Sequence, residues 1–163
     1  LKGAIADWTK AIEMYPRYGI AYYNRGVARY ELGDFRGAIA DYTKAIEYDP
    51  NYASAYNNRG NSKDRLKDHQ GAISDYTKAI EIKPKYSRAY FNRGNSKDEL
   101  KDYQGAIFDY TKAIKFSPEY YKAYTNRGIT LEKAGNLKDA CKDWKKAVNL
   151  GDTKPIEWVR NQC

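Results

Sequence analysis

The chain has 163 residues, of which 31% are charged, and 29 lysines and arginines against 21 aspartates and glutamates give it a formal net charge of +8. No apolar run approaches the roughly 20 residues that a membrane-spanning helix needs. The positive charge is not accompanied by interleaved aromatic and basic residues or by a known nucleic-acid motif. The composition therefore excludes a membrane span and argues against nucleic acid as a partner.

A step of 34 residues organises nearly the whole sequence, and the proline positions mark it: Pro16, Pro50, Pro84 and Pro118. Self-similarity at such a period is typical of an array of one small structural unit. A new unit begins directly after each proline-x-tyrosine segment. The chain then divides into a half unit at 1–18, four full units at 19–52, 53–86, 87–120 and 121–154, and a final segment at 155–163. We expect these pieces to form one domain.

Residues 1–18 match only the second half of a unit, and they carry Ile5, Trp8 and Ile12 on one helical face. No first half that would cover this face stands before them in the sequence. We expect the chain to be a piece of a longer array. The alternative is self-association that covers the bare helix, which predicts a homo-oligomer.

Each full unit predicts two helices, and each of them has one apolar face. In 53–86 the first face carries Tyr56 and Gly60, and the second carries Ala72 and Tyr76. We expect Gly60 to lie against Ala72 where the two helices cross, with the tyrosines filling the space beside them.

The ends of the second helices are marked by polar residues and by proline. A proline ends the second helix in three of the full units because it has no N–H to donate. The residues placed to cap the start of each second helix are Asp34, Asp68, Asp102 and Asn136.

The final segment departs from the repeat, because the proline column lapses after Leu150. Residues 155–163 place Ile156, Val159 and Cys163 on one helical face, which predicts a closing helix. Cys163 could then meet Cys141. A disulfide, which would indicate an oxidising compartment, and two free thiols packed as small apolar residues both fit the sequence.

Five columns keep one residue type in every full unit. They are aromatic at position four (Tyr22, Tyr56, Tyr90, Tyr124), glycine at eight (Gly26, Gly60, Gly94, Gly128), alanine at twenty (Ala38, Ala72, Ala106, Ala140), aromatic at twenty-four (Tyr42, Tyr76, Tyr110, Trp144) and alanine at twenty-seven (Ala45, Ala79, Ala113, Ala147). With the proline at thirty-two, this pattern resembles the tetratricopeptide repeat over essentially the whole chain. The resemblance implies an all-α, right-handed superhelix of antiparallel helix pairs whose first helices line a concave groove.

No catalytic or metal-binding constellation is present in the sequence. The only histidine, His69, occupies a column otherwise filled by Phe35, Tyr103 and Leu137, so we expect it to pack at the start of a helix. A metal site needs several converging ligands, and a nucleophile needs a base beside it. We therefore expect neither an enzyme nor a bound cofactor.

A second glycine column lies inside the second helices, at Gly3, Gly37, Gly71 and Gly105. Each of these glycines costs roughly 0.5–1 kcal/mol of helix stability relative to alanine. Close approach of a neighbouring helix is one explanation.

Position six carries asparagine in all four full units: Asn24, Asn58, Asn92 and Asn126. An asparagine side chain has one acceptor and two donors, so a row of them can pair with the backbone of an extended peptide whatever its side chains. In the family that the pattern resembles, position six faces the groove, and the row is similar to the asparagine ladder of the O-linked N-acetylglucosamine transferase repeats. The alternative is that these amides bond to a neighbouring helix.

Other positions that the resemblance places in the groove would give selectivity. They are Tyr23, Asn61, Arg88, Phe91, Asn95 and Lys122, with Asn57 and Thr125 in the same column as Tyr23 and Phe91. The two-carboxylate clamp of chaperone adaptors is incomplete here, since Asn57 replaces its lysine and Asn126 its arginine. Losing two cations weakens the case for an acidic tail as the ligand.

Position seven is always arginine and position twenty-three always aspartate in the full units. We expect these columns to pair and to set the register of the helices, and the sequence leaves open whether the partners share a unit. The residues are Arg25, Arg59, Arg93 and Arg127 with Asp41, Asp75, Asp109 and Asp143.

The sequence thus predicts a noncatalytic scaffold that binds a peptide or protein segment in its concave groove through the asparagine row. The alternative is a structural array that self-associates through its stacked ends. The compartment is not indicated by the sequence.

Overall fold

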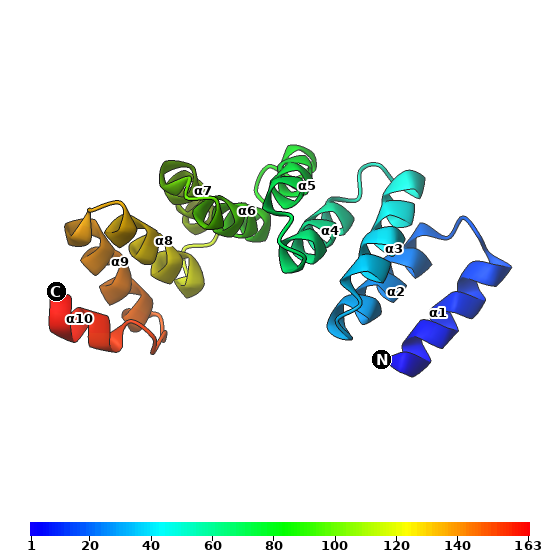
Figure 1. The fold of residues 1–163 in the computed structure, drawn as a ribbon, viewed down its shortest axis with the longest axis horizontal. Coiled ribbons are helices and arrows are strands. Elements are labelled where there is room, and N and C mark those ends of the chain that lie inside the picture. Colours follow the sequence, from blue (N-terminus) through cyan, green and yellow to red (C-terminus); the bar gives the residue numbers. More distant parts are fainter. The chain divides into compact units, whose positions relative to one another are not determined.

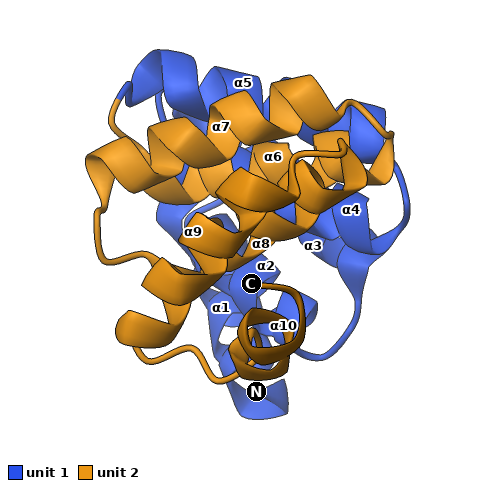
Figure 2. Ribbon diagram, turned by 90° about the vertical axis from the view of Figure 1, so that its left-hand side faces the viewer, with its two compact units in different colours: residues 1–84 blue, residues 85–163 orange.

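The computed structural model describes residues 1–163 as ten α-helices with no strand (Figure 1). The predicted all-α array of antiparallel helix pairs is confirmed. None of the helices has the length and apolarity to span a membrane. The chain forms two compact units, Leu1–Pro84 and Lys85–Cys163 (Figure 2). The expected grouping of all repeats into one domain stays a prediction.

The first compact unit contains five helices, and each of them packs on the one that follows it in the chain. They are α1 (Lys2–Met14), α2 (Gly19–Glu31), α3 (Phe35–Tyr48), α4 (Ala53–Arg65) and α5 (His69–Ile82). The second compact unit also contains five helices, packed in the same way. They are α6 (Ser87–Glu99), α7 (Tyr103–Phe116), α8 (Tyr121–Lys133), α9 (Leu137–Asn149) and α10 (Ile156–Gln162).

The second helix of each full repeat begins at the predicted cap. Asp34, for example, accepts a hydrogen bond from the backbone N–H of Gly37 at 2.9 Å. Asp68 and Asp102 accept in the same way from the backbone N–H groups of Gly71 and Gly105. A Cβ on Gly37 would collide with the Asp34 carboxylate. The atoms nearest to an added Cβ at Gly37, Gly71 and Gly105 all belong to the capping aspartate, so these glycines leave space beside the cap, whereas Gly3 has no such neighbour.

The glycine at position eight makes room for an aromatic ring of the same repeat. A Cβ on Gly60 would lie 2.7 Å from Cε1 of Tyr76, and Gly26 and Gly94 face Tyr42 and Tyr110 in the same way. The atoms nearest to such a Cβ on Gly60 belong to the Tyr76 ring, and in the fourth repeat the backbone oxygen of Ala140, the equivalent of Ala72, also lies 3.2 Å from a Cβ on Gly128. The alanines at positions twenty and twenty-seven of the full repeats are fully buried.

The arginine and aspartate columns pair within one repeat. Arg25 donates to Asp41 from Nε at 2.9 Å and from Nη2 at 2.7 Å, and its Nη1 donates to Thr9 of α1 at 3.1 Å. The same bidentate pair recurs at Arg59 with Asp75, Arg93 with Asp109 and Arg127 with Asp143. Because the aspartates are buried, a bidentate arginine is the partner that offsets their desolvation.

The last helix is held by a disulfide between Cys141 on α9 and Cys163, so the open question of the sequence is decided in favour of a bridge. α10 packs on α9, with the rings of Trp144 and Trp158 5.3 Å apart. Asp152, which stands where the other repeats have proline, is buried and accepts hydrogen bonds from the Thr125 hydroxyl and from the backbone N–H of Lys154.

Candidate functional site

Two hollows lie along the first helices of the second compact unit. One, of about 280 Å³, is the lysine hollow, lined by Phe91, Tyr121, Lys122, Thr125, Asn126, Asp152 and Lys154. The other, of about 370 Å³, is the mixed hollow, lined by Asn95, Asp98, Glu99, Tyr110, Asn126, Ile129, Thr130 and Lys133. Both are formed mainly by α6 and α8, so first helices build the candidate site.

Asn126 belongs to both hollows. Its Nδ2 donates to Oδ1 of Asn95 at 2.9 Å, and the hydroxyl of Tyr110 donates to the same oxygen at 2.8 Å. Burial raises the pKa of Tyr110, so its hydroxyl keeps its proton and remains a donor at neutral pH. Because Nδ2 of Asn126 donates to Asn95, the orientation of the amide is fixed. Its other atom, Oδ1, is a hydrogen-bond acceptor where the two hollows meet.

The lysine hollow combines two cations with an aromatic wall. Lys122 and Lys154 are exposed, and neither forms an ion pair. The Phe91 ring is held by Tyr120, with 4.9 Å between the ring centroids, and by Tyr110 at 5.8 Å. Because the nearby Asp152 is buried and engaged, the two free ammonium groups give this hollow a local preference for an acidic group.

The mixed hollow carries both signs of charge. Asp98 accepts from Nζ of Lys133 at 2.5 Å and from the Thr130 hydroxyl at 2.9 Å. Glu99 is exposed at the end of α6. With Lys133 already paired, the exposed carboxylate is the group in this hollow best placed to meet a basic side chain.

In the first compact unit the asparagine row makes internal bonds. Asn58 donates from Nδ2 to the Tyr23 hydroxyl at 3.0 Å, and its Oδ1 accepts from Nδ2 of Asn57 at 3.1 Å. Tyr23 packs against Tyr52 with 4.7 Å between ring centroids. Asn58 and Asn126 therefore both bond to the preceding first helix, which was the alternative to peptide contact. Contact with a ligand stays a prediction for the whole row.

The other residues predicted for the site are spread over the first helices. Asn24 and Asn92 are half-buried, on α2 and α6, and Arg88 is exposed near the start of α6. Asn61 accepts from the Tyr76 hydroxyl at 2.8 Å, so it supports the core ring.

Two residues of the groove column are buried, although Thr125 still contributes to the lining of the lysine hollow. Asn57 is 0% exposed and Thr125 is 3% exposed, because short side chains at position five stay between the helices where Tyr23 and Phe91 reach outward. His69 is the first residue of α5, as predicted, and its Nδ1 lies 2.9 Å from Oδ1 of Asp64, so it makes a polar contact that its apolar column did not suggest.

The sequence did not point to Asp152 and Lys154 as part of a site. The available signal was the lapse of the proline column, where a buried aspartate anchors the turn that brings Lys154 to α8. No group of three or more histidine, cysteine, aspartate or glutamate side chains is arranged to hold a metal ion.

Paired helices with small residues at every crossing, repeated along the chain, define an α-helical repeat array. Models of the tetratricopeptide repeat match residues 19–52, 53–86 and 87–120, and further models of the same repeat match 1–35 and 109–142. The chain belongs to the tetratricopeptide repeat family, whose members are generally protein-interaction scaffolds. No curated protein matches the sequence.

Solved structures show the same fold. The crystal structure of MamA is 28% identical, with a TM-score of 0.87, and the match covers 91% of this chain and 87% of that one. A MamA structure from Desulfovibrio magneticus RS-1 is 21% identical, with a TM-score of 0.86, covering 94% of this chain and 86% of that one. The first repeat domain of Spaghetti (RPAP3), bound to the HSP90 peptide SRMEEVD, is 25% identical, with a TM-score of 0.71. The match covers 72% of this chain and 93% of that one.

Proposed function

We propose that this protein is a scaffold whose first helices bind an extended peptide or protein segment, with Asn24, Asn58, Asn92 and Asn126 contacting the backbone of the ligand. The single observation that carries the proposal is the place of Asn126, which links two hollows and presents an acceptor between them. A backbone N–H of an extended segment is the group such an acceptor suits. The similarity to a repeat domain that holds a peptide supports the same class of ligand.

The charges of the hollows define the kind of segment that fits. The lysine hollow favours an acidic group beside the Phe91 ring, and the mixed hollow favours a basic one beside Glu99. Along α8, Thr125 and Thr130 are about 7–8 Å apart at 1.5 Å per residue, which two to three residues of an extended peptide span. A short segment with an acidic and a basic residue two to four positions apart therefore suits this surface.

The test begins with displayed 12-residue peptides selected on the full chain, from which the best binders are synthesised and titrated. Asn126→Ala is expected to weaken their binding by about tenfold, because one backbone hydrogen bond and the order of the hollow are lost. Asn149→Ala, an exposed asparagine on the second helix α9, is the matched control and should leave binding unchanged. Equal binding by the chain with and without Asn126→Ala would contradict the proposal.

Self-association through the stacked ends is the second candidate, and the observation in its favour is that no residue of α1 is buried. Light scattering over a wide concentration range tests it. A mass that stays that of one chain at high concentration rules this candidate out.

A further inference from the structure

Another hollow of the second compact unit, which we call the Leu131 hollow, has a volume of about 260 Å³. Its lining comes from α7, α8 and α9: Ile107, Thr111, Arg127, Leu131, Asp139, Lys142 and Asp143. None of these residues lines the lysine hollow or the mixed hollow. On α8, Arg127 lies about 100° around the helix from Asn126. The Leu131 hollow is therefore a separate surface from the one proposed for the asparagine row.

The other repeats show what the polar side of this hollow lacks. In each of the first three full repeats, the buried aspartate at position twenty-three contacts an arginine from position seven and a second cation from position eleven. The second cations are Arg29, Lys63 and Lys97, which contact Asp41, Asp75 and Asp109 at 3.0, 2.8 and 2.8 Å. In the fourth repeat position eleven is Leu131, which has no charge to offer.

Asp143, the aspartate of the fourth repeat, keeps only the first of the two cations. Arg127 donates to both of its carboxylate oxygens, from Nε to Oδ2 and from Nη2 to Oδ1, each at 2.7 Å. In the first three repeats it is Oδ2 that also contacts the second cation. Asp143 is only 6% exposed but lines the Leu131 hollow. The place of the missing cation therefore opens into this hollow.

The rest of the lining suits the stem of a long basic side chain. Ile107 on α7 and Leu131 on α8 are partly exposed, and apolar side chains of this kind pack against the methylene groups of arginine or lysine. Lys142, the other cation of the lining, contacts Asp139 at 2.7 Å. The hollow thus combines an apolar wall with a buried carboxylate that has one cation fewer than its equivalents.

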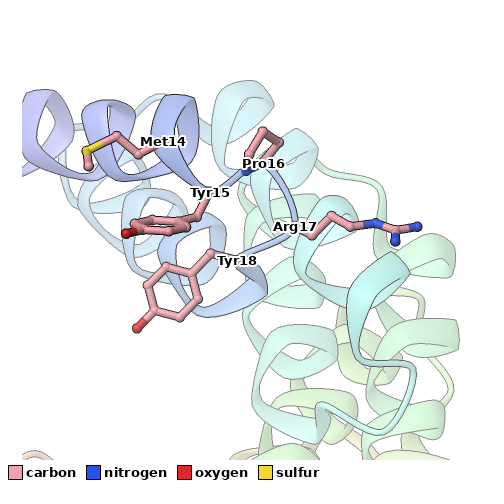
Figure 3. A pocket seen from close by; sticks show the side chains of 5 residues that line it. All are labelled: Met14, Tyr15, Pro16, Arg17 and Tyr18. Atoms are coloured by element: carbon pink, nitrogen blue, oxygen red, sulfur yellow. The ribbon is translucent and has the colours of Figure 1, made fainter.

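The hollow at the Met14–Tyr18 loop is larger, at about 680 Å³, but it has a different character. It is lined by Met14, Tyr15, Pro16, Arg17 and Tyr18, and none of them is buried. Figure 3 shows the rings of Tyr15 and Tyr18 pointing to the same side of this loop, while Arg17 points away from them. Because no carboxylate lines this hollow, a cation has no partner in it.

We propose that the Leu131 hollow binds one arginine side chain of a protein partner, with the guanidinium group on Oδ2 of Asp143 and the methylene groups between Ile107 and Leu131. The guanidinium group takes the place that Lys97 has on Asp109 in the third repeat. Arginine suits a buried carboxylate because its planar cation is more weakly hydrated than an ammonium group. The net charge of +8 disfavours a run of basic residues, so the expected segment has a single arginine between uncharged residues.

The test follows the isotopically labelled isoleucine and leucine methyl groups of the full chain by NMR. The probe is the blocked peptide acetyl-Ala-Leu-Arg-Leu-Ala-amide, and its control carries citrulline, which keeps the shape of arginine without the charge. The methyl signals of Ile107 and Leu131 should shift with the arginine peptide in the millimolar range expected of so small a contact. Citrulline should weaken the binding by about tenfold, because a hydrogen bond between charged groups is lost.

Two variants at position 131 separate a cation site from a merely apolar hollow. Leu131→Lys supplies the missing cation from the chain itself, as Lys97 does, so the Ile107 signal should no longer respond to the arginine peptide. Leu131→Met has a similar length and no charge, and as the matched control it should bind as the parent chain does. Leu131→Lys should also unfold at no lower temperature than Leu131→Met, because its ammonium group adds an ion pair to Asp143.

Loss of binding with Leu131→Lys but not with Leu131→Met, together with weaker binding of the citrulline peptide, supports the proposal. Equal binding of the two peptides, or unchanged binding by Leu131→Lys, overturns it. The mixed hollow is a competing site beside Glu99, and the methyl groups of Ile129 report on it. Shifts at Ile129 without shifts at Ile107 would place the arginine there, which overturns the proposal and leaves the function proposed for the asparagine row intact.

Discussion

At the scale of single residues, two glycine columns have different partners. Gly37 and its equivalents leave space for the side chain of a capping aspartate, which is the end of a flexible group. Gly60 and its equivalents leave space for a tyrosine ring that is buried between two helices. The first kind of contact can relax by a side-chain rotation, and the second cannot relax without moving a helix.

Alanine at the two glycines should therefore have unequal effects. Gly60→Ala is expected to cost about 1–3 kcal/mol of unfolding free energy through overpacking against Tyr76. Gly37→Ala should change it by less than about 1 kcal/mol, because weakening of the cap is offset by the better helix propensity of alanine. Urea unfolding of both variants measures the difference, and a larger loss at Gly37 would contradict the assignment of the two contacts.

The asparagine row should also divide into two kinds of residue. Asn58→Ala removes hydrogen bonds to Tyr23 and Asn57 and is expected to cost about 1 kcal/mol or more. Asn24 makes no side-chain hydrogen bond and is half-buried, so Asn24→Ala should leave the unfolding midpoint nearly unchanged. Thermal unfolding compares them directly, and the Asn24 variant is the cleaner one for testing ligand contact.

The buried tyrosines predict sensitivity to alkali. Burial raises the pKa of Tyr42, Tyr76 and Tyr110 well above the ordinary value of 10.0, and the Asp64 carboxylate adds to the effect at Tyr76. The unfolded chain loses these protons first as the pH rises, so their contribution to stability is complete below about pH 10 and is lost above it.

Helix content and tyrosinate absorbance, recorded together against pH, should show these three tyrosines ionising only as the helices unfold. Ionisation of all tyrosines near pH 10 with the helices intact would show that the three rings are not buried as described.

At the scale of the element, each second helix is fixed by its aspartate at position twenty-three. A second cation joins the pair in three repeats: Arg29 contacts Asp41 at 3.0 Å, Lys63 contacts Asp75 at 2.8 Å, and Lys97 contacts Asp109 at 2.8 Å. In the fourth repeat the residue in this place is Leu131, so Asp143 depends on Arg127 alone. The register of each helix pair is thus set by polar groups inside an otherwise small-residue interface.

The last element, α10, depends on the disulfide. The bridge spans a sequence separation of 22 residues, and closing a loop of this size is worth about 3 kcal/mol in the chain-entropy model. Reduction should lower the unfolding midpoint of the chain, because α10 and the Trp158 ring are then free to leave Trp144. The double variant Cys141→Ser with Cys163→Ser should start at the lower midpoint and be insensitive to reductant.

The helices and their caps could be predicted from the sequence because each depends on a local pattern that repeats four times. That Gly37 lies beside its capping aspartate and Gly60 beside a tyrosine ring could not be predicted, since these contacts depend on the depth at which the helices cross. The positions of Lys122 and Phe91 on the first helices could be predicted from their columns in the repeat. The position of Lys154 could not be predicted, because it depends on a turn found once in the chain, where Asp152 accepts a hydrogen bond from Thr125.

At the scale of the whole molecule, the two compact units differ in the surroundings of the asparagines on their first helices. In Leu1–Pro84 the half-buried amide of Asn58 is hydrogen-bonded to Tyr23 and Asn57. In Lys85–Cys163 Asn126 stands between two hollows with free lysines on one side and an exposed glutamate on the other. We therefore expect the second compact unit to contribute most of the selectivity for charged side chains, with Lys122→Glu weakening an acidic ligand more than Lys112→Glu on α7.

We propose that the first helices bind an extended segment through the amides at position six. Side-chain amide signals of the isotopically labelled protein, followed by NMR during titration with a selected peptide, test it most directly. The signals of Asn24, Asn58, Asn92 and Asn126 are expected to shift while that of Asn149 does not. Shifts confined to the second helices or to α1, with these four amides unchanged, would contradict it.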